Sequence, residues 1–92
     1  LGKLGFAARC TSPKTGITME VYTDQPGVQL YTGNWMSGNI RGKHGHRYPA
    51  RAALCLETQH YPDSPNRPEY PTTRLNPGET FHSVTAFRFI VG

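Results

Sequence analysis

The chain has 92 residues, which is enough for at most one small domain with a modest hydrophobic core. Ten Lys and Arg against six Asp and Glu give a formal net charge of +4, but the cations are scattered among loops. We therefore expect no nucleic-acid partner, and no membrane partner, because no apolar run approaches the ~20 residues of a membrane span.

The chain opens with LGKLGFAARC and not with methionine, so we expect it to be the interior of a longer protein. Its two cysteines, Cys10 and Cys55, both lie in apolar, strand-like runs. We predict that both are buried and reduced, and a disulfide between them is the alternative. Reduced thiols favour a cytoplasmic location.

The first third of the chain predicts three strands. Residues 5–10 and 17–23 are strand-like and are separated by the turn-like stretch 12–16, which predicts a hairpin. Residues 24–27 read DQPG, and this places Pro and Gly as in a type II turn. Residues 28–32 alternate between apolar and polar side chains and predict a third strand.

The rest of the chain alternates between long loops and two further strands. A glycine-rich loop covers 33–51, and the apolar run at 52–58 predicts a strand buried on both faces as far as Glu57. A proline-rich loop fills 59–79, and residues 80–91 predict the last strand. Five strands without a helix make the predicted fold all-β, with too few strands to cover their own apolar faces.

Glu57 is the first candidate for a functional side chain. It follows three apolar strand residues, and a buried carboxylate is costly unless it is paired, hydrogen-bonded or functional. A general base is the functional interpretation. A salt bridge to one of the arginines Arg51, Arg67 or Arg74, or simple exposure at the strand end, is the structural alternative.

Gln29 is the second candidate, because an amide on the polar face of an apolar strand can both donate to and accept from a sugar hydroxyl. A surface glutamine on a half-exposed strand is the alternative. Three aromatic residues, Tyr22, Tyr31 and Trp35, could form a platform on which a sugar ring stacks, or could be part of the core.

Two further patterns have weaker functional interpretations. His44 and His46 share one face of an extended segment, but no third ligand has a recognisable spacing, so we expect no metal site. Prolines recur at every third position of the proline-rich loop, at Pro62, Pro65, Pro68 and Pro71. They could form a polyproline II docking segment, but a rigid loop is the preferred interpretation.

Three stretches taken together carry a family resemblance. TDQPGVQLYTGN at 23–34, CLETQHYPDSPNRPEYP at 55–71 and LNPGETF at 75–81 resemble, in order and spacing, the C-terminal third of the aldose 1-epimerases, or galactose mutarotases. The resemblance implies that residues 1–92 are the C-terminal segment of a single aldose 1-epimerase domain. It also implies an antiparallel β-sandwich, to which this segment contributes the last strands.

The resemblance further implies a reaction, the interconversion of the α and β anomers of free aldohexoses such as galactose and glucose. Glu57 falls on the family's glutamate base, which takes the proton from the C1 hydroxyl, and Gln29 falls on a glutamine that contacts the sugar. The family uses no metal and no organic cofactor. The implied partners are a monosaccharide substrate and the remainder of the domain.

The chain departs from the family in what it lacks. The family's general-acid histidine lies upstream of the matching stretches, and none of His44, His46, His60 and His82 matches its motif. A segment that carries the base alone is therefore expected to be nearly inactive. The alternative function is a non-catalytic carbohydrate-binding β-sandwich module. The loop GKHGHRY at 42–48 is more basic than the resemblance leads us to expect.

Overall fold

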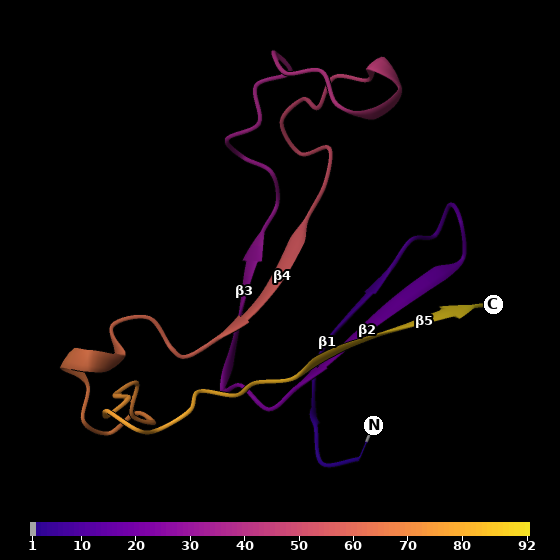
Figure 1. Cartoon of the computed structure of the whole chain (residues 1–92). Helices are drawn as coiled ribbons and strands as arrows, with labels where there is room; N and C mark the ends of the chain where they lie inside the picture. Colours follow the sequence, from indigo (N-terminus) through magenta and orange to yellow (C-terminus); the bar gives the residue numbers. More distant parts are fainter. Residues whose placement is uncertain (1) are drawn as a thin grey trace.

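The computed structural model describes residues 2–92, which form five β-strands and two short 3-10 turns without any α-helix (Figure 1). The strands pair antiparallel in two sheets, one of order β1–β2–β5 and one of order β3–β4. Their bounds are β1 Gly5–Thr11, β2 Ile17–Thr23, β3 Gly27–Tyr31, β4 Cys55–Gln59 and β5 Thr85–Val91. The predicted all-β, antiparallel fold class is confirmed. No helix within residues 2–92 is long and apolar enough to cross a membrane.

The central strand of the larger sheet, β2, has one apolar and one polar face. On the apolar face Val21 is fully buried between its neighbours on β1 and β5. On the polar face Glu20 is only 5% exposed, since Arg9 of β1 and Arg88 of β5 lie opposite it in register. The Arg9 Nη2 lies 2.8 Å from Glu20 Oε2, and Arg88 Nη1 lies 3.8 Å from Glu20 Oε1. A one-residue slip of either outer strand would break this pairing, so the ion pairs help to fix the register of the sheet.

Threonine hydroxyls connect the two sheets. Thr58 of β4 and Thr85 of β5 lie 2.6 Å apart through their Oγ1 atoms. Thr85 is in turn 3.3 Å from the hydroxyl of Thr23 on β2, which donates to the carbonyl oxygen of Val84. The short β3–β4 sheet is thereby attached to the larger sheet at the C-terminal end of β4.

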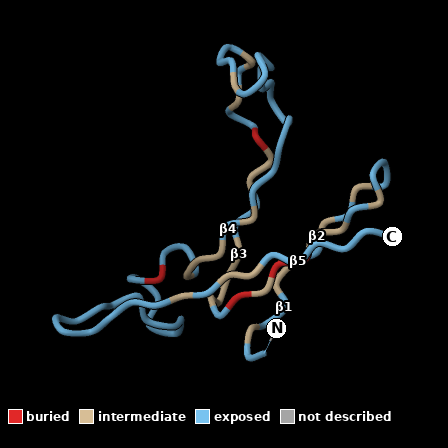
Figure 2. The backbone as a smooth tube through the Cα atoms, turned by 45° about the vertical axis from the view of Figure 1, so that its right-hand side comes forward, coloured by how far each residue is buried: buried red, intermediate tan, exposed pale blue. Residues whose placement is uncertain are grey.

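The molecule is open and its core is thin. Its radius of gyration is 16.9 Å, whereas a compact domain of this length has a radius of about 12 Å. Figure 2 shows that buried residues are few and lie in short, separate segments of the tube. On the apolar face of β5 the side chains of Phe87, Phe89 and Val91 are 50%, 65% and 78% exposed. This face needs a cover that residues 2–92 do not provide.

The structure corrects several boundaries. The fourth strand starts at Cys55 and is not buried on both faces, because both Cys55 and Glu57 are exposed. The cysteines are free, as predicted, but Cys10 is only half-buried and Cys55 is exposed, so the prediction that both are buried was wrong. Residues 80–84 precede the last strand and are not part of it.

The DQPG stretch does not form the expected type II turn. Such a turn requires a positive φ at its glycine, and Gly27 is not among the residues with positive φ. Gly27 instead begins β3, where the ring of Tyr61 packs against it. A Cβ on Gly27 would lie 3.1 Å from Tyr61 Cδ1, so the ring takes the space of a side chain.

Candidate functional site

The structure brings the two predicted site residues together. Gln29 on β3 and Glu57 on β4 are direct partners in the antiparallel ladder. Directly opposed side chains lie on the same face of a sheet, with Cβ atoms about 4.5–5.5 Å apart. The amide and the carboxylate can therefore contact one small hydroxylated ligand at the same time.

Both side chains are accessible from solvent. The neighbouring residue Thr58 faces the larger sheet through its bond to Thr85, and because side chains alternate along a strand, Glu57 faces away from that sheet. Apolar residues Leu30 and Leu56 are paired on the same side as Thr58. The β3–β4 sheet thus has an apolar face toward the larger sheet and a polar face that carries the candidate site.

Glu57 is not held by a salt bridge within residues 2–92. The ion pairs there join Glu20 to Arg9 and Arg88, and Asp63 to Arg67. The structural alternative of a pairing with Arg51, Arg67 or Arg74 is therefore wrong for the described part of the chain. The carboxylate is instead exposed within residues 2–92, as the other structural alternative predicted, and the expectation that it ends a strand buried on both faces is not met.

The proline-rich loop after β4 is locked by its own contacts. Ser64 is 6% exposed and donates to the carbonyl oxygen of Tyr61. Asp63, which has a left-handed backbone conformation, accepts hydrogen bonds from Asn66 Nδ2 at 2.7 Å and Arg67 Nε at 3.3 Å. A 3-10 turn at Ser64–Asn66 interrupts the segment, so the prolines do not lie along one continuous polyproline II helix. The structure favours the rigid-loop interpretation over the docking segment.

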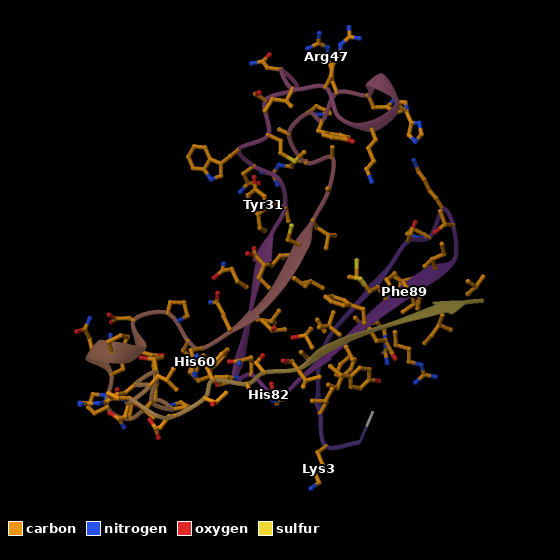
Figure 3. The ribbon with its side chains drawn as sticks, viewed as in Figure 1. Lys3, Tyr31, Arg47, His60, His82 and Phe89 are labelled. Atoms are coloured by element: carbon orange, nitrogen blue, oxygen red, sulfur yellow. The ribbon has the colours of Figure 1, made fainter. Side chains whose placement is uncertain are left out.

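An aromatic hollow continues the polar face of β3. Tyr31 lies two residues beyond Gln29, about 6.6 Å along the strand, and its hydroxyl accepts a hydrogen bond from the backbone N–H of Trp35 at 3.2 Å. Both aromatic residues line a hollow of about 270 Å³ (Figure 3 labels Tyr31). Tyr22 does not belong to this group, because it lies on the other sheet, packs edge-on against Phe6 and donates to Glu20.

The histidines do not form a metal centre in the described residues. His44 and His46 have ring centroids 6.5 Å apart, and no group of three or more ligating side chains occurs within residues 2–92. His60 and His82 line a separate hollow of about 340 Å³ beside Phe81 (Figure 3). His60 follows β4, and Phe81 contacts it with ring centroids 6.2 Å apart.

Sequence reasoning missed two parts of this arrangement. Met36, Ile40 and Tyr48 join Tyr31 and Trp35 in the aromatic hollow, although they lie in a loop without any periodic pattern. The threonine contact that orients β4 was also missed, since nothing in the sequence pairs Thr58 with Thr85. Both contacts depend on how the loop and the two sheets fold back on one another.

The comparisons with known proteins agree on one family. The sequence profile of the family described as aldose 1-epimerase matches residues 3–88. Over 86 residues the chain is 50% identical to galactose mutarotase of Mus musculus and 48% identical to that of Homo sapiens, with 94% of this chain covered in both cases. It is 39% identical over 87 residues to aldose 1-epimerase of Escherichia coli, with 91% of the chain covered. The chain spans 25% of the length of each of these relatives.

Proposed function

Because this chain belongs to the aldose 1-epimerase family, we propose that it supplies the general base and one sugar contact for the interconversion of aldohexose anomers. The observation that carries the proposal is the direct pairing of Gln29 with Glu57 across β3 and β4. Residues far apart in sequence, both singled out by the family resemblance, meet on one accessible face.

The roles follow from the chemistry of the two groups. The Glu57 carboxylate removes the proton from the C1 hydroxyl while a general acid protonates the ring oxygen, and the C1–O5 bond breaks. Rotation about the C1–C2 bond exposes the other face of the aldehyde, and the reverse steps close the ring as the other anomer. Gln29 donates to and accepts from sugar hydroxyls throughout, so it binds the sugar without exchanging a proton with it. We assign neither a metal nor an organic cofactor to these steps.

The general acid is proposed to come from outside these residues. The polar face of the β3–β4 sheet carries no histidine, since the two strands read GVQLY and CLETQ. We propose that residues 1–92 are the C-terminal segment of one larger domain, and that the remainder of that domain supplies the acid. The same remainder is proposed to cover the exposed apolar face of β5. Free cysteines support a reducing, cytoplasmic location.

The proposed substrates are free galactose and glucose, and the test is the rate of anomer interconversion. Freshly dissolved α-galactose or α-glucose is followed by polarimetry with the full-length protein, and the spontaneous rate is subtracted. Methyl α-galactoside, which has no C1 hydroxyl proton, should inhibit by occupying the site without being converted. Binding of the methyl glycoside without any acceleration for the free sugars would favour the non-catalytic carbohydrate-binding module instead.

A further inference from the structure

The glycine-rich loop at 33–51, here called the basic arm, carries charge that the proposed function does not use. No acidic residue occurs between Asp24 and Glu57, and the arm carries four of the chain's ten Lys and Arg. All four are exposed, and none takes part in a salt bridge within residues 2–92. They are Arg41, Lys43, Arg47 and Arg51.

The arm is a folded structure that extends beyond the ends of β3 and β4 (Figure 1). Its base is closed by the N–H of Arg51, which donates to the carbonyl oxygen of Gly33 at 3.1 Å. Near its tip the N–H of Gly42 donates to the carbonyl oxygen of His46 at 2.7 Å, and the ring of Tyr48 lies against Gly42. A Cβ on Gly42 would lie 2.0 Å from Tyr48 Cε2, so a larger residue there would require the Tyr48 ring to move. The cations are therefore held on a defined scaffold.

The aromatic hollow opens beside these cations. Its wall residues Trp35 and Ile40 are 89% and 75% exposed within residues 2–92, so the described chain leaves them open to a further protein segment. Arg47 Nη1 lies 3.3 Å from the carbonyl oxygen of Gly38, another wall residue, and the N–H of Lys43 donates to the Tyr48 hydroxyl at 3.1 Å. The hollow, at about 270 Å³, is smaller than the roughly 300–1,000 Å³ of small-molecule sites. It suits one apolar side chain.

We propose that the basic arm binds an acidic protein segment that places one aromatic or branched aliphatic side chain in the hollow. Carboxylates of the segment pair with the surrounding cations, and exposed Trp and Arg are the residues that most often carry binding energy at protein interfaces. A second copy of residues 1–92 does not supply the acidic segment. Of its six acidic residues Glu20 and Asp63 are already in ion pairs and Glu57 belongs to the candidate site, which leaves no acidic cluster.

The test measures binding of a fluorescent peptide to the full-length protein by fluorescence anisotropy. The peptide has about nine residues, all Asp or Glu except for one central Phe. Replacing three arm cations by glutamine should weaken binding about tenfold, and replacing Phe by Gly in the peptide should do the same. The arm changes are Arg41→Gln, Lys43→Gln and Arg51→Gln. The control, which removes the same charge elsewhere, combines Lys3→Gln, Lys14→Gln and Arg74→Gln and should change binding less than about twofold.

Several results would overturn the proposal. Equal losses from both triple variants would mean that only net charge matters, and an unchanged affinity for the Phe-to-Gly peptide would remove the role of the hollow. Binding of duplex DNA or anionic vesicles, but not of the peptide, would assign the arm to a different class of partner. A lower melting temperature in the arm variant alone would show that the arm packs against acids of its own protein.

Discussion

Gln29 and Glu57 lie directly opposite each other in the β3–β4 ladder, and the pairing gives the amide and the carboxylate one shared face. Directly opposed side chains have Cβ atoms about 5 Å apart, so both can contact one small ligand. The pairing also gives the two residues different roles. Only the carboxylate can take a proton, so changes at the two positions should differ in kind.

Gln29→Ala is expected to raise KM more than it lowers kcat. In its proposed role the amide contacts the sugar in the ground state and the transition state alike, and loss of such uniform binding leaves kcat largely unchanged. Polarimetry over a range of galactose concentrations measures both constants. Asn39→Ala, which removes an exposed amide from the basic arm, should change neither. A fall in kcat at unchanged KM would give Gln29 a part in the chemical step.

Thr58→Val is expected to loosen the strand that carries Glu57. The substitution removes the 2.6 Å contact with the Thr85 hydroxyl and should cost about 1 kcal/mol in the free energy of unfolding. It should also lower kcat, because a carboxylate that is less well oriented transfers protons less efficiently. Thr11→Val removes a comparable hydroxyl pair with Thr18, 2.9 Å apart on the other sheet, and should leave kcat unchanged. Equal kcat values for the two variants would mean that the contact between Thr58 and Thr85 does not affect catalysis.

Glu20 should make stability depend on pH on the acidic side. Its pKa is lowered from the ordinary 4.5, first by the hydrogen bond from Arg9 and further by Tyr22 and the two arginine charges, against the opposing effect of burial. A lowered folded-state pKa means that the unfolded chain binds the proton more readily. The contribution is therefore fully present above about pH 4.5 and is lost as the pH falls through the lower, folded-state value.

Urea unfolding of the full-length protein at several pH values tests this. The difference in unfolding free energy between the wild type and Glu20→Gln should be constant near neutral pH and should shrink below about pH 4.5. Thr11→Val, which removes no titratable group, should show no such change. If the difference in unfolding free energy between the wild type and Glu20→Gln grew on acidification, the inferred direction of the Glu20 pKa shift would be wrong.

Residues 1–92 by themselves are expected to associate and to unfold without a sharp transition. Phe87, Phe89 and Val91 expose half or more of their surface on one sheet face, and such a patch promotes association. Circular dichroism and size exclusion on the isolated chain measure both properties. A monomer with a cooperative melting curve would show that the open structure is stable without a cover.

The sequence predicted the strands better than their surroundings. Alternation located Ile17–Thr23 to the residue, because the period of two is a property of the strand itself. The burial of Glu20 could not be predicted, since it depends on Arg9 and Arg88 meeting it from two other strands. The burial expected for Cys55 was wrong. An apolar run indicates that a strand needs other residues to pack against it, and residues 2–92 do not supply them. The two site residues were candidates from their strand context, the family resemblance gave them roles, and the register then placed them opposite each other.

The most direct test of the central claim is kcat for anomer interconversion in Glu57→Gln of the full-length protein, measured by polarimetry on fresh α-galactose. The amide keeps the shape of the side chain but cannot take the proton, so kcat should fall by about 10²–10⁴-fold, the usual contribution of one acid–base group. Inhibition by methyl α-galactoside should persist, and Glu69→Gln should retain the wild-type rate. If Glu57→Gln retained more than about a tenth of the wild-type kcat, Glu57 would not be the base.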